Sequence, residues 1–193
     1  FGVYFFSGAF MAFLALLALG TLLVQRSGRL THAITIEHYH DIGKFLFAFI
    51  VFWAYIAFSQ YLLIWYANVP EETVWYLRRQ TGAWTGVGLL LLFGHFLAPF
   101  LALLSRKPKR RPRLLAGLAL WMLFMHWIDI YWIVMPEMNR EAQGVVPLHL
   151  ADLSFFLVFA GLFIALTARR LSACSLIAEG DPRLIESLTF ENV

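Results

Sequence analysis

The chain has a single cysteine, Cys174, and few charged residues. One thiol cannot form an internal disulfide, and it cannot supply the thiolates that hold an iron-sulfur cluster. Any such cluster that works with this protein must therefore belong to a partner. Asp, Glu, Lys and Arg together make up 14% of the residues, whereas average soluble domains contain about 25%. This shortage of charge excludes an ordinary soluble domain.

Long apolar stretches take the place of the missing charge. Hydrophobic residues make up 61% of the chain, and its mean hydropathy is +0.71. Each stretch is close to the ~20 residues that a helix needs to cross ~30 Å of hydrocarbon. The five stretches are residues 2–24, 42–66, 84–104, 114–135 and 148–168. They predict an all-α integral membrane protein, with a transmembrane helical bundle over residues 1–170 and a cytoplasmic tail over residues 171–193.

Basic residues are distributed unevenly between the two sides of these spans. Of the fifteen Lys and Arg residues, Arg78, Arg79 and Arg140 lie on one side and the other twelve lie on the opposite side. Basic residues in short loops remain in the cytoplasm, so we expect the amino end outside and the carboxyl end in the cytoplasm. The basic run over residues 106–113 fits this topology, and it could also bind anionic lipid head groups.

The connections between the spans are short, which predicts antiparallel neighbours and an up-down four-helix bundle with one extra helix. Residues 68–79 contain Pro70 followed by two Glu residues, which suit a helix start and predict a short interfacial helix. The chain enters its first apolar helix at Phe1, without an initiator Met. We therefore expect further helices to precede it in the complete protein.

Ionisable residues within the spans carry the functional information, because each costs at least about 2.5 to 3.5 kcal/mol in hydrocarbon. His126 and Asp129 stand three residues apart in the fourth stretch, and His149 and Asp152 do so at the start of the fifth. This spacing places each pair on one helix face. His95 lies near the middle of the third stretch, where an imidazole of ordinary pKa ~6.5 could pass protons in either direction.

A dense polar segment at the inner end of the second stretch contains Glu37, His38, His40, Asp41 and Lys44. Carboxylates, imidazoles and hydroxyls of this kind build proton relays through membranes. The candidate proton path comprises His38, His40, Asp41, Lys44, His95, His126, Asp129, His149 and Asp152. Three other interpretations stay open, since the pairs could be hydrogen bonds between helices, the segment a solvated helix entrance, and His95 a satisfied core histidine.

A b-type haem is a further alternative for the histidines. His95 and His126 lie at similar depth in their spans and could face each other as axial ligands. The second haem pair that is usual in such cytochromes is missing, and Asp129 would be a poor neighbour for a porphyrin. A proton-coupled transporter is another alternative, for which Pro99 is the feature nearest to a broken helix.

Three strings carry a resemblance to a known family: EHYHDIGKFLFAF over residues 37–49, WAYIAFSQYLLIWYANVPEE over 53–72 and WIDIYWIV over 127–134. They resemble the polysulfide-reductase-type, or NrfD-like, membrane subunits, and most closely the second such subunit of bacterial alternative complex III. The resemblance implies a subunit of about ten spans in two bundles, of which this chain would be the second half. It also implies the bacterial inner membrane as the location.

The resemblance further implies a quinol-oxidising complex with a homologous membrane subunit, an iron-sulfur protein and cytochrome c subunits as partners, beside lipids and without nucleic acid. Iron-sulfur clusters and c-type haems would lie on those partners, quinol could lie nearby, and no haem, metal or other cofactor is expected on this chain. The family's quinol pocket belongs to the first bundle of the other subunit. A quinone-binding membrane anchor is an alternative function for this chain. The implied role is structural and proton-conducting, at positions His38, His40, Asp41, Lys44 and Asp129.

Overall fold

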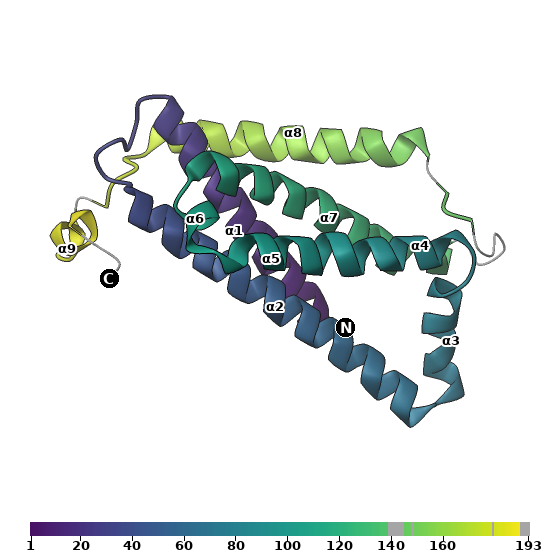
Figure 1. The fold of residues 1–193 in the computed structure, drawn as a ribbon. Coiled ribbons are helices and arrows are strands. Elements are labelled where there is room, and N and C mark those ends of the chain that lie inside the picture. The colour runs from purple at the N-terminus through teal and green to yellow at the C-terminus, as the bar shows by residue number, and fades with distance from the viewer. Residues whose placement is uncertain (139–144, 148, 179, 190–193) are drawn as a thin grey trace.

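A computed structural model describes residues 1–138, 145–147, 149–178 and 180–189, and these residues form helices joined by loops. Five helical segments are long and apolar enough to cross a membrane. They are α1 (Gly2–Arg26), α2 (Ile36–Ala67), the continuous segment Ala83–Leu104, α7 (Pro112–Met138) and α8 (Leu150–Ala173) (Figure 1). The prediction of an all-helical, multi-pass membrane protein is thus confirmed for the described residues.

Shorter helices occupy the connections. Helix α3 (Pro70–Arg79) forms where the short helix was predicted, with Pro70 in its first turn. Helix α6 (Arg106–Lys109) precedes α7, and α9 (Leu184–Leu188) lies in the tail. We name the two ends of the molecule by these helices. The α3 end contains α3 and the amino end of α1, and the α6 end contains α6 and the amino ends of α2 and α7.

Helix α2 begins at Ile36, six residues before the predicted apolar stretch, because local hydrogen bonds stabilise its first turn. The Thr35 side chain and the His38 side chain each bond the other residue's backbone in a capping box. The backbone N–H of Thr35 donates to Nδ1 of His38 over 3.1 Å. The polar segment over residues 37–44 therefore belongs to the helix itself, and not to a loop before it.

Four of the five long segments pack on one another. Helix α1 packs against both α2 and α7, and α2 also packs against the segment Ala83–Leu104. Their shared core is apolar and consists of Met11, Leu14, Ala15, Ala18, Tyr39, Leu46, Ile50, Leu103, Leu115, Ala119 and Met122. Helix α8, at the top of Figure 1, has no buried residue, and its Phe156 ring meets Trp127 of α7 with centroids 6.0 Å apart.

Pro136 interrupts the hydrogen bonds of α7 near the α3 end. Proline has no N–H, so it cannot donate to the carbonyl of Trp132 four residues earlier. Arg79 supplies the missing donor, because its Nε donates to the Trp132 carbonyl over 3.1 Å and its Nη2 to the Ile133 carbonyl over 2.5 Å. Its guanidinium also lies 3.5 Å from the centre of the Trp75 ring. Arg79 thereby joins α3 to α7.

The Arg79 side chain is fully buried, although it lies in a connection between two membrane spans. Burial lowers its pKa to about 10, and the nearby carboxylate of Glu137 opposes this shift. The guanidinium therefore remains a cation at neutral pH. Carbonyl oxygens and an aromatic face take the place of water around the charge.

Candidate functional site

The third long segment changes its helical geometry at the residue that the sequence marked as a midpoint group. Between α4 (Ala83–Leu90) and α5 (Ala98–Leu104), residues Leu91–Leu97 form the π-helix η1, in which the N–H of Ala98 donates to the Phe93 carbonyl five residues back. Pro99 explains why this segment is a π-helix, because proline has no N–H to donate to a carbonyl of the preceding turn. This turn carries His95.

The carbonyl of Gly94 shows how the π-helix is stabilised. Neither helical register gives it a donor, since Ala98 bonds to Phe93 and the fifth residue onward is Pro99. The indole Nε1 of Trp121 on α7 donates to this carbonyl over 2.7 Å. A side chain of a neighbouring helix thus satisfies a backbone group that proline leaves unpaired within the span, as Arg79 does at Pro136.

Among the described residues, Asp129 of α7 is the buried carboxylate. Tyr4 of α1 donates its hydroxyl to Oδ1 over 2.5 Å, and Trp53 of α2 donates its indole N–H to Oδ2 over 3.1 Å. Asp129 itself is 1% exposed. Three separate helices therefore meet at one carboxylate, with two neutral donors and no water-facing side.

Two histidines complete what we call the central cluster, defined as Tyr4, Trp53, His95, His126 and Asp129. Nδ1 of His126 lies 3.8 Å from Oδ2 of Asp129. The His95 ring lies 4.0 Å from the Trp53 ring and 6.3 Å from the His126 ring, measured between centroids. The structure thus brings His95 close to His126, as their similar depth in the sequence predicted, and it places Asp129 beside them.

The histidines of the central cluster have unused hydrogen-bonding capacity. Three buried nitrogens have no hydrogen-bond partner among the described residues. They are both ring nitrogens of His95 and Nδ1 of His126. Buried imidazoles are normally paired, or bridged by ordered water. Proton exchange between His126 and Asp129 needs only a small side-chain movement, whereas His95 would need an intervening water.

A haem does not fit between His95 and His126 as they stand. The Trp53 ring already lies against His95, and a Cβ at Gly8 would come within 2.7 Å of Cε1 of His126. The protein therefore fills the surroundings of both rings, where a porphyrin would need a wide slot. Among the described residues, no group of three or more His, Cys, Asp or Glu side chains is placed to hold a metal ion.

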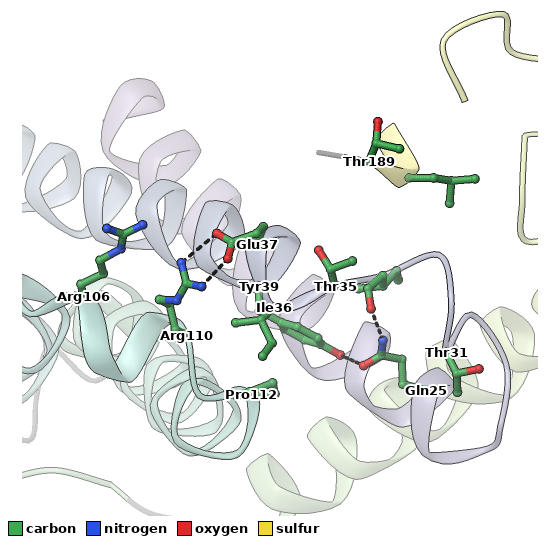
Figure 2. Close-up of a pocket in the computed structure, with 12 residues that line it drawn as sticks. Gln25, Thr31, Thr35, Ile36, Glu37, Tyr39, Arg106, Arg110, Pro112 and Thr189 are labelled. Atoms are coloured by element: carbon green, nitrogen blue, oxygen red, sulfur yellow. Dashed lines mark hydrogen bonds and ion pairs between the residues drawn. The ribbon is translucent and has the colours of Figure 1, made fainter. Parts of the chain in front are cut away.

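The polar residues at the α6 end form caps and ion pairs, and Figure 2 shows the pair of Glu37 and Arg110. Glu37 pairs with Arg110, and Nη1 of Arg110 donates to Oε2 over 2.9 Å. Tyr39 donates its hydroxyl to Oε1 of Gln25 over 2.7 Å. We call the set Glu37, His38, His40, Asp41, Lys44 and Arg110 the α6-end cluster.

Three of the predicted path residues in this cluster have local partners. Nζ of Lys44 lies 2.6 Å from Oδ1 of Asp41, one turn away on the same helix. His38 contributes to the capping box with Thr35. His40 is buried, and its Nδ1 has no hydrogen-bond partner within the described chain. The cluster thus has the partners expected of a helix entrance, with His40 as its exception.

An apolar layer separates the α6-end cluster from the central cluster. His40 and Trp53 are thirteen residues apart on α2, which corresponds to about 20 Å along a helix. The layer between them consists of the buried side chains Met11, Leu14, Leu46, Ile50, Leu103 and Met122. Tyr55, which could have extended a polar line along α2, is 64% exposed. The path drawn from the sequence is thus divided into two parts.

His149 and Asp152 lie at the start of α8, outside the central cluster, and Asp152 interacts with Tyr131 of α7. The backbone N–H of His149 donates to Oδ2 of Asp152 over 3.2 Å, so the pair caps this helix. His149 is exposed. The structure therefore joins these two residues to each other and does not bring them into the central cluster.

A pocket of about 780 Å³ adjoins the central cluster on the side of α4 and η1. Tyr4 and Trp53 form part of its wall, and Tyr76, Arg79 and Trp132 line it towards the α3 end. The buried Nε1 of Trp132 has no hydrogen-bond partner among the described residues. The remaining lining is mainly apolar.

Sequence reasoning missed Tyr4, Trp53 and Arg79. Tyr4 and Trp53 looked like ordinary aromatic residues of apolar helices, and their shared target became visible only when three helices were placed together. Gly8, one turn after Tyr4, was a signal of close packing, and it abuts His126. Neither the protein-family models nor the curated protein sequences that were compared with the chain match it.

Proposed function

We propose that this chain is an integral membrane subunit of a quinol-oxidising electron-transfer complex of the alternative complex III type, and that its central cluster binds and releases a proton. One observation carries the proton-binding role: the buried carboxylate of Asp129 receives two neutral donors and lies beside an imidazole, with a second imidazole nearby. The strings over residues 37–49, 53–72 and 127–134 support the assignment to this type of complex.

The chemistry of the central cluster follows from the cost of burying charge. An isolated carboxylate in a medium of low dielectric constant is strongly unfavourable, and two hydrogen bonds offset only part of that cost. One proton shared by His126 and Asp129 would relieve this cost in either position. On Asp129 it gives a neutral carboxylic acid, and on His126 it gives an ion pair with the carboxylate. The unpaired nitrogens of His95 offer the next acceptor. The cluster is therefore suited to hold one proton and to exchange it.

The direction of exchange follows from the apolar layer. Because that layer lies towards the α6 end, we propose that protons reach the central cluster from the α3 end. With the amino end outside and the carboxyl end in the cytoplasm, as the charge distribution indicates, this is the outer side of an up-down bundle. The subunit would then accept protons released by quinol oxidation and pass them outwards, while electrons travel through iron-sulfur and cytochrome c partners in the same membrane complex.

A comparison of two aspartates tests the proposal in the purified complex. We expect Asp129→Asn to slow quinol oxidation and proton release at least tenfold, whereas Asp41→Asn changes both less than twofold. Quinol turnover is measured with an added electron acceptor, and proton release with a pH dye. Infrared difference spectra should contain a carboxyl band that Asp129→Asn removes. Equal turnover and proton release in both variants would refute the proton-binding role.

The membership in such a complex is tested separately by isolating the native protein in mild detergent. We expect the preparation to contain a second homologous membrane subunit together with polypeptides that stain for covalently bound haem. Isolation of the chain free of any haem-bearing or iron-sulfur partner, from membranes that oxidise quinol, would contradict the assignment.

Quinone binding is the second candidate function, and the pocket beside Trp53 favours it. Its apolar walls fit an isoprenoid tail, and Nε1 of Trp132 is an unpaired donor for a quinone carbonyl. A photoreactive azido-quinone should then label residues 84–96 of the intact complex. Labelling confined to the other subunits would leave this chain without a quinone site.

A further inference from the structure

A basic pocket lies at the α6 end, between the carboxyl end of α1 and the amino end of α7. Its volume is about 800 Å³. Four arginines from two parts of the sequence line it, together with two leucines that continue onto the apolar helix surfaces: Arg26, Arg110, Arg111, Arg113, Leu22 and Leu114. A group of like charges converging on one hollow is unfavourable unless an anion compensates them.

Internal carboxylates compensate one of the four arginines. Arg110 pairs with Glu37. Within the described part of the chain, Arg26, Arg111 and Arg113 have neither an ion pair nor a side-chain hydrogen bond, and all three are exposed. They therefore present three uncompensated guanidinium groups, which suit the planar oxygens of a phosphate.

The start of α7 adds to the same positive field. Its first intrahelical donor is the N–H of Leu115, which bonds to the carbonyl of Arg111 over 3.0 Å. The N–H groups of Arg113 and Leu114 precede it and have no intrahelical acceptor. This helix is 27 residues long, so its dipole reinforces the arginine charges at the pocket.

The position of the pocket, at the ends of two membrane-spanning helices, favours an anion that also has an apolar part. Leu22 belongs to the last turns of α1 and Leu114 to the first turn of α7, where loops give way to membrane-spanning helices. Leu114 is about half exposed, and Leu23 beside the pocket is more exposed still. A ligand that combines a phosphate with hydrocarbon chains would contact both the guanidinium groups and these apolar surfaces.

We propose that this pocket binds the head group of an anionic phospholipid. The phosphate lies among Arg26, Arg111 and Arg113, and the acyl chains follow Leu22 and Leu114 along α1 and α7. The lipid belongs to the leaflet at the α6 end, and its site is independent of the central cluster. Each basic residue near a membrane surface contributes about 1 kcal/mol to anionic lipid binding, so the three together should favour such a lipid on the order of 100-fold.

Native mass spectrometry of the full chain, purified with added lipid, tests the site. The probes are dioleoyl phosphatidylglycerol, which is anionic, and dioleoyl phosphatidylcholine, which is net neutral. The triple variant R26Q/R111Q/R113Q removes the pocket's free charges. The matched control R29Q/R169Q/R170Q removes the same number of arginines from exposed positions that do not line the pocket. Circular dichroism and gel filtration establish that each variant is folded.

We expect the wild type and the control to retain phosphatidylglycerol in preference to phosphatidylcholine, and the pocket variant to lose most of this preference. Equal losses in both triple variants would show a diffuse surface effect and overturn the site. Displacement of the lipid by millimolar inorganic phosphate would overturn the lipid in favour of a soluble anion. If the triple variant does not fold, R111Q and R113Q replace it, each with an expected loss of about fivefold, and unchanged retention in both would refute the proposal.

Discussion

The central cluster and the α6-end cluster contain the same residue types, histidines and aspartates at helical spacing, yet they differ in their surroundings. Asp129 is almost completely buried and receives bonds from two other helices. Asp41 is partly exposed, and its ion pair with Lys44 lies on its own helix. The difference teaches that spacing along a helix identifies a pair, but burial by other helices decides whether the pair is costly and therefore informative.

The largest effect on stability is expected from Asp129→Leu. The variant leaves the Tyr4 hydroxyl and the Trp53 indole N–H buried without an acceptor, which should lower the free energy of unfolding by about 3–5 kcal/mol. Thermal unfolding in detergent measures the change. Asp41→Leu is the matched control, with an expected loss below about 1 kcal/mol. Similar losses in the two variants would remove the distinction between the clusters.

A smaller loss of stability is expected from changing Arg79, and a smaller one still from changing its neighbour Arg78. Arg79→Met removes the donors of the Trp132 and Ile133 carbonyls beside Pro136 and should cost about 2–4 kcal/mol. Arg78→Met removes one partly exposed contact, in which Nη1 lies 2.8 Å from Oε2 of Glu137, and should cost below about 1 kcal/mol. The denaturant midpoints of the two variants provide the measurement. A larger loss from the Arg78 change would contradict the buried role of Arg79.

Two glycines, one beside each cluster, allow the packing around the two clusters to be compared. A Cβ at Gly8 would lie 2.7 Å from Cε1 of His126, and one at Gly43 would lie 2.9 Å from Cγ of Lys109. We expect Gly8→Ala to destabilise the protein by about 1–3 kcal/mol through overpacking. Gly43→Ala should cost a similar amount, because Cβ and Cα of Lys109, which would lie 3.0 and 3.4 Å from the new Cβ, are held by the α6 backbone.

The Gly8 comparison has a second readout in the complex. Gly8→Ala should also slow quinol turnover, since it displaces His126 from Asp129, whereas Gly43→Ala should leave turnover unchanged. Thermal unfolding and turnover are measured on the same preparations. A Gly8→Ala protein with wild-type stability and turnover would show that the close approach to His126 is unimportant.

The smallest effect is expected from Lys44→Gln. Its ion pair with Asp41 is accessible to water and screened by salt, so the free energy of unfolding should fall by at most about 0.5 kcal/mol. The difference from wild type should vanish in 1 M salt. A loss of more than 2 kcal/mol would place the α6-end cluster in the same class as the central one.

The sequence predicted the helices better than their contacts. Apolar runs of twenty residues or more allow one reading in a membrane protein, because every backbone group in hydrocarbon must be paired. The predicted stretch at residues 148–168 and the observed α8 at Leu150–Ala173 differ by a few residues at each end. The start of α2 was less predictable, because the capping box of Thr35 and His38 extends the helix through polar residues.

The geometry of the site could be predicted only in part. His126 and Asp129 share a helix, and that pairing follows from their spacing. The choice of Tyr4 and Trp53 as donors depends on the rotation of α1 and α2 about their axes, and helices that are apolar on all sides contain no polar stripe to indicate it. The π-helix at His95 depends jointly on Pro99 and on Trp121 of another helix.

The bond between Arg79 and the carbonyls released by Pro136 has a consequence for biogenesis. Arg79 precedes Pro136 by 57 residues, so at 5–20 residues per second the ribosome adds the proline about 3 to 11 s later. During most of that interval the guanidinium has no acceptors, because Trp132 and Ile133 have not yet been synthesised. Arg79 is thus synthesised before the turn of α7 that Pro136 interrupts, so the donor exists before its acceptors do.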